Sequence, residues 1–357
     1  MWKIIYSYIF IFSLLASLIL VSISRSFAIK FNIIDCPRSQ RKIHKTPMPL
    51  LGGAAMFSAF GLTISFNLWL ISFFSGHNIM PEAIVIYLSG IKSISVQLCA
   101  ILGTSFVLVI MGIFDDNKGI SAFIKLGIEI ILASIVFFSG IKISLFVHNQ
   151  FISWMLTVLW IVGISNAFNL LDNMDGLSSG IALISAIIFF IAACFAQQFF
   201  VATILACFCG VLLGFLFFNF PPAKVFMGDA GSLFIGYLLS ILTIISTYYT
   251  NSAPTPAPVV MPLLIMAVPI LDTVSVICIR IKNRKSIFLA DKNHLSHRLL
   301  SRGMSIKQTL FFIYLLSFSI GLGALLLKSL NPIGCYIILI QAVCMILIIV
   351  ILEGKKQ

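Results

Sequence analysis

Charged residues are scarce in this chain. Only 10% of its 357 residues are Asp, Glu, Lys or Arg, whereas a soluble domain contains about 25%. Hydrophobic residues make up 60% of the chain, and the mean hydropathy is +1.13. No soluble core needs so many long apolar runs. The composition therefore excludes an ordinary soluble protein and predicts a polytopic membrane protein.

Several functional signatures are also missing. There is no Walker A pattern and no dinucleotide-binding glycine pattern, so ATP or NAD binding has no support. The basic residues do not form a stripe suited to nucleic acid, and no nucleic-acid partner is expected. The chain has eight cysteines but no C-x-x-C motif, and seven of them lie in apolar runs. We expect inert, buried thiols rather than a disulfide framework or a zinc site.

The apolar runs predict an all-α bundle of about eleven transmembrane helices. The first run is long enough to cross a bilayer, and its flanking cations, Arg25 and Lys30, lie on its C-terminal side. That arrangement is the reverse of a signal peptide, so an uncleaved first helix is expected. The expected spans are residues 4–24, 50–74, 94–114, 123–140, 151–168, 178–196, 199–219, 231–250, 258–279, 308–328 and 333–352.

The distribution of Lys and Arg predicts the orientation of these spans. Of the 23 basic residues, all but Lys3, Lys92, Lys142 and Lys328 fall on one side of the expected membrane. Because cytoplasmic connections are enriched in Lys and Arg, we expect an outside N-terminus and a cytoplasmic C-terminus. A single transmembrane domain is expected over residues 1–357, with cytoplasmic loops at about 25–49, 115–122, 169–177, 220–230 and 280–307. Most of the acidic residues lie in or beside these same loops.

The first cytoplasmic loop is strongly basic. Arg41, Lys42, His44 and Lys45 precede a Gly-Gly pair that begins a helix. Helix N-terminal amides together with Lys and Arg suit a phosphate group. The alternative is a topology signal that also touches anionic lipid.

An acidic pair, Asp115 and Asp116, directly follows the apolar run that ends at Phe114. Adjacent carboxylates raise each other's proton affinity unless a cation lies between them. A metal ion or a proton-accepting role would explain the pair. The alternative is a solvated helix C-terminus, although acids at that position oppose the helix dipole.

Polar side chains recur in the stretch from Ser165 to Gly176. Asn169, Asp172 and Asp175 are spaced i, i+3, i+6, and lie within about a third of the helix circumference if the helix continues. Asn166 and Asn169 add amide groups that bind oxygen or nitrogen atoms of a polar ligand. A hydrated loop is the alternative.

Asp229 lies between Gly228 and Gly231, just before an expected helix. Glycines allow close approach of the backbone, and a lone Asp there suits a hard cation that holds phosphate oxygens. An ordinary helix N-cap is the alternative.

A last polar segment carries His294, His297 and Arg298. This group suits a diphosphate, whereas two histidines are too few ligands for zinc without help. A solvated loop is the alternative. Further inside the expected spans, Glu129 and Asp272 are each expected to face the bundle interior and pair with a cation or polar group.

Taken together, these stretches resemble the polyprenyl-phosphate N-acetylhexosamine-1-phosphate transferases, a family that includes the WecA and MraY types. Five matching stretches run in the family's order over most of the chain. They are Arg41-Lys-Ile-His-Lys with Pro49-Leu-Leu-Gly-Gly, Gly112-Ile-Phe-Asp-Asp, Asn166-Ala-Phe-Asn-Leu-Leu-Asp-Asn-Met-Asp-Gly, Val225-Phe-Met-Gly-Asp-Ala-Gly-Ser and Asp291-Lys-Asn-His-Leu-Ser-His-Arg.

The resemblance implies an enzyme of the bacterial inner membrane with its site on the cytoplasmic face. It would transfer a sugar-1-phosphate, with GlcNAc-1-phosphate expected, from a UDP-amino sugar to undecaprenyl phosphate and release UMP. The cofactor would be Mg²⁺, with Mn²⁺ as a substitute, and the product would initiate O-antigen or other cell-envelope polysaccharide synthesis. A homodimer is one possible oligomeric state.

The eleven expected spans fit the WecA branch. The loop and triple histidine typical of the MraY branch are not found. A phospho-MurNAc-pentapeptide transferase of that branch is therefore only the alternative. A transporter or flippase is an alternative of another class, but its ionisable residues should lie near the bilayer midplane rather than at one face.

The resemblance also implies roles for particular residues. Catalytic and metal-binding roles fall on Asp115, Asp116 and Asp229. Substrate-binding roles fall on Arg41, Lys42, His44, Lys45, Asn166, Asn169, Asp172, Asp175, Phe226, His294, His297 and Arg298. One residue departs from the pattern, because Ser296 stands where this branch commonly has the middle histidine. That departure indicates either a different amino sugar or a serine that only donates a hydrogen bond.

Overall fold

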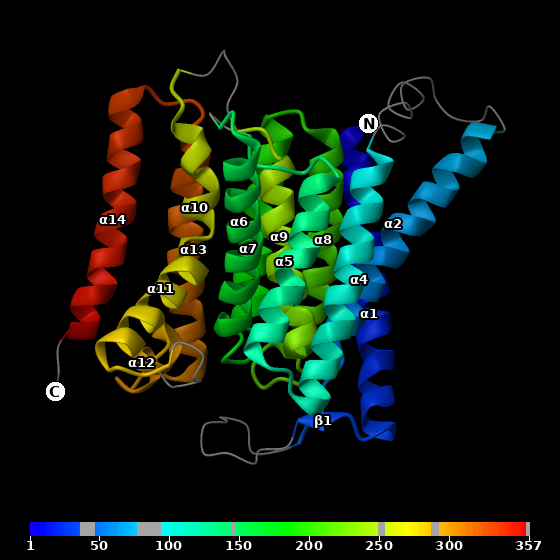
Figure 1. Ribbon diagram of the computed structural model, residues 1–357, viewed down its shortest axis with the longest axis horizontal. Coiled ribbons are helices and arrows are strands. Elements are labelled where there is room, and N and C mark those ends of the chain that lie inside the picture. The colour runs from blue at the N-terminus through cyan, green and yellow to red at the C-terminus, as the bar shows by residue number, and fades with distance from the viewer. Residues whose placement is uncertain (36–46, 77–93, 145–146, 249–253, 287–292, 355–357) are drawn as a thin grey trace.

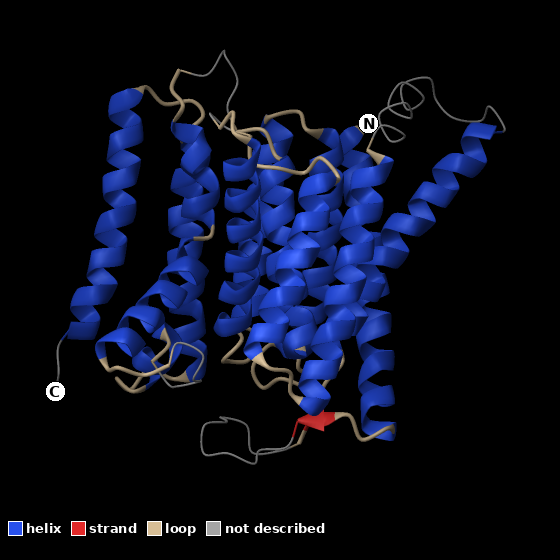
Figure 2. Ribbon diagram, viewed as in Figure 1, coloured by secondary structure: helices blue, strands red, loops and turns tan. Residues whose placement is uncertain are grey.

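The computed structural model describes residues 1–35, 47–76, 94–144, 147–248, 254–286 and 293–354 (Figure 1). The chain forms a bundle of nearly antiparallel helices (Figure 2). They are α1 (Trp2–Lys30), α2 (Gly52–Gly76), α4 (Ser95–Lys118), α5 (Ala122–Phe138), α6 (Gln150–Leu171), α7 (Leu177–Phe195), α8 (Phe199–Asn219), α9 (Gly228–Ile245), η1 (Ala257–Val260), α10 (Met261–Ile265), α11 (Ala267–Lys282), α12 (Leu295–Leu300), α13 (Ile306–Leu326) and α14 (Pro332–Gly354).

The helices confirm a polytopic membrane bundle. Within the described residues, eight helices are long and apolar enough to cross a membrane, or nine if the bent pair α10–α11 is one span. Each of the eleven expected ranges overlaps a helix, but α5 has only 17 residues. The count of eleven crossings therefore stays a prediction. The beginning of α1 and the end of α14 lie at opposite ends of the bundle (Figure 1).

The span expected at residues 258–279 is broken. The axes of η1–α10 and α11 differ by 68°, and the break falls at Met266. Pro269 explains the position of the break. A proline has no N–H to donate to the carbonyl four residues earlier, here that of Ile265, and its ring clashes with that carbonyl.

One small sheet interrupts the all-helical architecture. Strands β1 (Ile34–Asp35) and β2 (Met48–Pro49) pair antiparallel, with Ile34 opposite Pro49. Strand β2 contacts α1, and β1 lies on the same side of the bundle as α12 (Figure 1). We call this side, at the bottom of Figure 1, the polar end.

Helix α9 forms the centre of the bundle. It packs against α2, α4, α6, α7 and α8, and all its residues from Ala230 to Thr243 are buried. Without a hydrophobic driving force between helices in lipid, such packing depends on close van der Waals contact, which small residues allow. The surrounding helices thus fix the position of the α9 N-terminus at the polar end.

The cysteines depart in part from the expected burial. Cys207, Cys209 and Cys335 are buried, whereas Cys99, Cys278 and Cys344 lie on the outer surface of the bundle. All the cysteines within the described residues are free thiols, which agrees with the absence of a disulfide framework. The outward positions suit an apolar thiol on a surface that faces lipid.

The closest approach of α4 to α9 predicts a stability difference between two glycines of α4. A Cβ at Gly112 would overlap the backbone of Ala230, whereas one at Gly103 would meet nothing within 4 Å. We expect Gly112→Ala to lower the melting temperature of the purified protein, by about 1–3 kcal/mol of stability, through overpacking. Gly103→Ala is the matched control and should leave the melting temperature unchanged or raised, because Ala favours the helix. Equal melting temperatures for the two variants would contradict this packing.

Candidate active site

The polar end holds a cluster of carboxylates bridged by a lysine. Lys125, in the first turn of α5, donates hydrogen bonds to Asp115 Oδ2 and, at 3.0 Å, to Asp229 Oδ2. The other oxygen of Asp115 accepts a hydrogen bond from the Ile120 amide at 2.6 Å. Asp115 is therefore not a solvated helix end. The Asp115 side chain is 7% exposed, and a cation separates it from Asp229.

Asp116 has a different environment from its neighbour. Its Oδ1 accepts a hydrogen bond from the Asp229 amide at 2.9 Å, at the first turn of α9. Gly228 has a φ of 65°, and a Cβ there would overlap the Asp116 carboxylate. Asp116 thus caps α9 from another helix, where a negative charge is stabilised by the free amides and the helix dipole.

Asn169 provides a second hydrogen-bond partner for the Asp229 carboxylate. Its amide group donates to Asp229 Oδ1 at 3.1 Å and to Ser232 Oγ at 2.9 Å. Both oxygens of Asp229 therefore have fixed partners, Lys125 on one and Asn169 on the other. The Asp229 side chain is still 33% exposed, so it is accessible to a ligand.

The i, i+3, i+6 pattern expected from Asn169 to Asp175 is not realised as one helical face. Helix α6 ends at Leu171, and Asp172 follows as its C-cap. Burial raises the pKa of the Asp172 carboxyl well above its usual range, and the negative charges of Asp229, Asp116 and Asp175 raise it further. Asp172 therefore belongs to the carboxylate cluster.

Two other polar residues of this stretch support the structure locally. Asp175 accepts a hydrogen bond from the Ala223 amide at 3.0 Å and holds the connection before α9. Asn166 donates to Glu129, which is buried in α5. The expected pairing of Glu129 with a polar group is confirmed.

The histidine segment is anchored by the broken helix. Asp272 of α11 contacts His294 Nδ1 at 2.8 Å and accepts a hydrogen bond from the Leu295 amide at 2.6 Å. Both side chains are buried, so the expected interior partner of Asp272 is a histidine. With Nδ1 engaged, Nε2 is the ring nitrogen left for a ligand. His297 is half-buried on α12, and its ring centroid lies 6.3 Å from that of His294, the N-cap of that helix.

Ser296, which stands where a histidine is common, is buried and has a hydrogen-bond partner. It is 1% exposed and donates a hydrogen bond to Asn173 Oδ1 in the α6–α7 connection. Ser296 therefore donates a hydrogen bond, as one of the two explanations expected, and a different amino sugar stays a prediction. Arg298 donates to Ser275 Oγ of α11 at 3.1 Å. These two contacts link α12 to the α6–α7 connection and to α11.

Phe226 belongs to the connection before α9, where its backbone forms a bridge to the start of α2. Its amide donates to Pro49 O at 2.9 Å, and its carbonyl accepts from the Gly52 amide at 3.1 Å. The Gly53 amide donates to Met227 O at 3.0 Å. The expectation that these N-terminal amides of α2 bind a phosphate is therefore wrong, since protein carbonyls already occupy them. Arg41, Lys42, His44 and Lys45 lie outside the described residues.

Sequence reasoning missed the role of Lys125. The charge pattern includes it only among the basic residues that mark the cytoplasmic side. A usable signal was present, because Lys125 and Glu129 are four residues apart in an otherwise apolar helix and therefore share one face. Two such side chains in an apolar helix indicate a polar interior.

Fold and site together define an integral membrane protein with a carboxylate-rich site at one end of its bundle. The family model described as glycosyl transferase family 4 matches residues 98–247, which include Asp115, Asp116, Lys125 and Asp229. The chain is 37% identical over 328 residues to a probable undecaprenyl-phosphate N-acetylglucosaminyl 1-phosphate transferase of Bacillus subtilis, covering 90% of this chain and 84% of the relative.

Two further relatives extend the comparison. A decaprenyl-phosphate N-acetylglucosaminephosphotransferase of Mycobacterium leprae is 30% identical over 332 residues, covering 85% of this chain and 79% of the relative. A phospho-N-acetylmuramoyl-pentapeptide-transferase of Streptococcus pyogenes is 36% identical over 215 residues, covering 57% of this chain and 61% of the relative. The chain belongs to glycosyl transferase family 4, as the resemblance of its motifs implied.

The anchor of the histidine segment predicts a stability loss. Asp272→Ala would leave the buried His294 ring and the Leu295 amide without their acceptor, which costs about 1–3 kcal/mol per buried group. We expect a clear drop in the melting temperature of the purified protein. Thr273→Ala is the matched control, because the Thr273 hydroxyl makes no hydrogen bond among the described residues. Equal melting temperatures in the two variants would refute the anchor.

Proposed function

We propose that the protein transfers N-acetylglucosamine-1-phosphate from UDP-N-acetylglucosamine to undecaprenyl phosphate. A lipid phosphate oxygen forms a bond to the phosphorus next to the sugar, and the bond from that phosphorus to the bridging oxygen breaks. UMP leaves with that oxygen, and the lipid carries a sugar diphosphate. The names of the relatives support both substrates.

The observation that carries the proposal is the Lys125 bridge between Asp115 and Asp229. Phosphoryl transfer between two anions depends on positioning them and neutralising their charge. Lys125 supplies a fixed positive charge inside the carboxylate cluster, where an approaching phosphate can take over one of its hydrogen bonds. Asp115, released from Lys125 in that exchange, would orient the lipid phosphate or accept its proton.

The remaining residues would bind the donor. Asn169 and Asp172 would form the nucleotide side of the site, and His294, His297 and Arg298 would hold the diphosphate or the sugar. Asp116 would act indirectly, because it fixes the N-terminus of α9 that carries Asp229. We also assign phosphate binding to the basic residues Arg41, Lys42, His44 and Lys45.

The residues fit Mg²⁺, although no three His, Cys, Asp or Glu side chains of the described residues are arranged as a ready metal site. Mg²⁺ usually takes only one or two carboxylates and completes its shell with water and substrate phosphates. Asp229 offers such a carboxylate, accessible and beside two further acids, and Asp115 or Asp116 would be the second. When bound, the ion would neutralise the diphosphate of the donor.

The proposed reaction also implies an orientation in the membrane and a cellular location. The polar end would face the cytoplasm, where UDP-sugars are made, with the N-terminus outside and the C-terminus inside. We propose a bacterial inner-membrane enzyme whose product starts the assembly of a cell-envelope polysaccharide such as O-antigen. The carboxylate cluster at one end, rather than at mid-bundle, supports an enzyme over a transporter.

Removal of the bridging charge tests the mechanism. We expect Lys125→Met to lower kcat for UMP release by about 100-fold or more, the usual cost of removing one positioned charge-stabilising donor. The assay uses purified protein, undecaprenyl phosphate, UDP-N-acetylglucosamine and Mg²⁺. Lys118→Met is the matched control, an exposed lysine at the end of α4, and should keep near wild-type turnover. Comparable turnover in both variants would remove Lys125 from the mechanism.

The metal assignment has its own test. Chelation with EDTA should abolish UMP release and added Mg²⁺ should restore it, with Mn²⁺ as a partial substitute. Asp229→Asn should lower kcat by about 100-fold even at saturating Mg²⁺, because the uncharged amide is a poor ligand for a hard cation. Full activity in EDTA would refute the metal requirement. If no UDP-amino sugar released UMP in the wild-type protein, the reaction class itself would be wrong.

A further inference from the structure

The reaction proposed above leaves one buried acid, Glu129, without a role. Glu129 lies in α5, is 2% exposed and accepts a hydrogen bond from the side-chain amide of Asn166 on α6. The same amide donates to Val162 O at 3.0 Å, so both of its hydrogens are engaged. Burying a carboxyl group in an apolar helix costs free energy that an apolar side chain would avoid. An acid kept at such a place points to a functional role.

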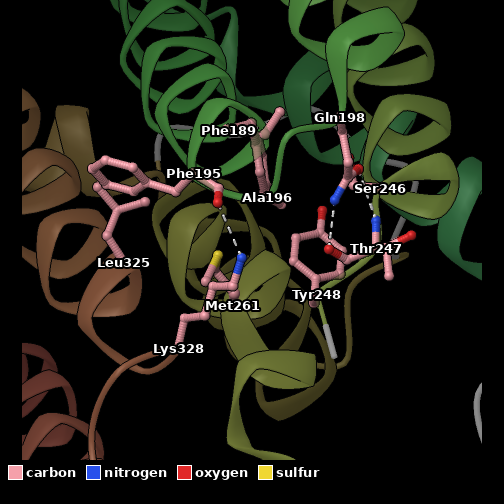
Figure 3. A pocket seen from close by; sticks show the side chains of 12 residues that line it. Phe189, Phe195, Ala196, Gln198, Ser246, Thr247, Tyr248, Met261, Leu325 and Lys328 are labelled. Carbon is pink, nitrogen blue, oxygen red and sulfur yellow. Dashed lines mark hydrogen bonds between the residues drawn. The ribbon is translucent and has the colours of Figure 1, made fainter. Parts of the chain in front are cut away.

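Polar side chains in other parts of the bundle mostly bond to the backbone. In the pocket at the end of the bundle opposite the carboxylate cluster, the Gln198 side chain exchanges two hydrogen bonds with the Thr247 backbone (Figure 3). That contact fastens one connection between helices to another. The contact of Glu129 with Asn166 is of another kind, because it joins two side chains that project from neighbouring helices.

Glu129 and Asn166 each lie one helical turn from a residue that holds Asp229. On α5, Lys125 precedes Glu129 by four residues, and on α6, Asn169 follows three residues after the Asn166 position. Each pair therefore shares one face of its helix. Lys125 donates to one oxygen of Asp229 and Asn169 to the other. The charges of Lys125 and Asp229 both act on the Glu129 carboxyl group. Together these contacts form a closed ring across α5, α6 and α9.

The ring makes the placement of Lys125 and Asn169 depend on the contact one turn away. Helices α5 and α6 pack against each other, but apolar packing in lipid sets their relative rotation only weakly. A hydrogen bond between side chains has a preferred direction and fixes that rotation. Without it, either helix could turn and draw a donor away from Asp229, and a misplacement of about 1 Å costs about 100-fold in rate.

We propose that Glu129 and Asn166 are positioning residues for the transferase reaction, an inference that rests on the function proposed above. Their hydrogen bond sets α5 against α6 so that Lys125 and Asn169 bind the two oxygens of Asp229 together. Neither residue would contact a substrate. The proposal also accounts for Asn166, whose place in its motif indicated substrate binding but whose amide is directed to Glu129.

Two hydrogen bonds between α5 and α6 can be compared by kinetics. Glu129→Leu should lower kcat for UMP release by about 10- to 100-fold, with KM for UDP-N-acetylglucosamine changed by less than about threefold, as for a residue that acts through another. Glu129→Gln keeps an acceptor for Asn166 and should restore most of the turnover.

The matched control is Ser134→Ala, which removes the other hydrogen bond, 3.1 Å long, from Trp154 of α6 to Ser134 of α5. This contact is not part of the ring, so the variant should keep near wild-type turnover. Wild-type kcat in Glu129→Leu, an equal loss in Ser134→Ala, or a Glu129→Gln variant as slow as Glu129→Leu would overturn the proposal.

Removing both partners separates positioning from stability. Glu129→Leu alone leaves the Asn166 amide without its acceptor and should lower the melting temperature. The double variant Glu129→Leu/Asn166→Leu replaces both partners with apolar groups, which is nearly neutral for stability. It should regain much of the melting temperature and keep the low kcat, and it serves if the single variant does not fold. Recovery of kcat together with the melting temperature would show that packing alone explains the pair.

The ring can also be tested without UMP release. Residues of one network have non-additive effects on stability, whereas distant residues add. We expect the drop in melting temperature of Asn166→Leu/Lys125→Met to be clearly smaller than the sum of the two single drops. Ser134→Ala/Lys125→Met should show the sum. Additive drops in the first pair would overturn the ring. If the wild type released no UMP, the proposed function would fail, and these melting temperatures would still decide whether the pair positions Lys125.

Discussion

Three aspartates converge where α4 meets the first turn of α9, and like charges at such distances repel unless a cation lies among them. Lys125 provides that cation by bridging Asp115 and Asp229. Asp116 is stabilised differently, by an amide at the helix N-terminus. The arrangement gathers several carboxylates at the polar end of the bundle, where burial and the neighbouring negative charges raise the pKa of the Asp172 carboxyl. A site that handles two phosphates needs such a preorganised balance of charge.

This arrangement of Lys125 among the aspartates depends on the central position of α9. Helices α2, α4 and α6 all contact it, and each contributes a partner near its first turn. The amides at the start of α2 bond to the carbonyls just before α9, α4 supplies Asp116, and α6 supplies Asn169. The carboxylate of Asp229 is held from several directions, so its geometry is fixed before any substrate arrives. Such preorganisation avoids the cost of reordering side chains during the reaction.

The break at Met266 has a function in this architecture. It bends the chain by 68° and brings α11 to the polar end at an angle, where Asp272 reaches the start of α12. The proline that breaks the helix therefore places the histidine segment next to the α6–α7 connection, which it contacts through Ser296 and Asn173.

The sequence by itself determined the class of fold, the approximate ranges of the helices and the gathering of acids at one end. Those features follow from hydropathy and the sorting of charge, which act locally along the chain. The motifs also determined the family. The sequence further indicated that Glu129 and Asp272 have interior partners, because ionised groups inside an apolar helix require them.

Only the tertiary structure decided which polar residues meet. Spacing assigned Asn169, Asp172 and Asp175 to one face, but α6 ends at Leu171, and Asp175 accepts a hydrogen bond from the Ala223 amide in the connection before α9. The basic residue Lys125 had the same appearance as any topology signal until α5 placed it between two aspartates. Ser296 was ambiguous until α12 turned it towards Asn173. In each case the partner lies far away in the chain, and contacts between distant segments depend on how the whole bundle packs.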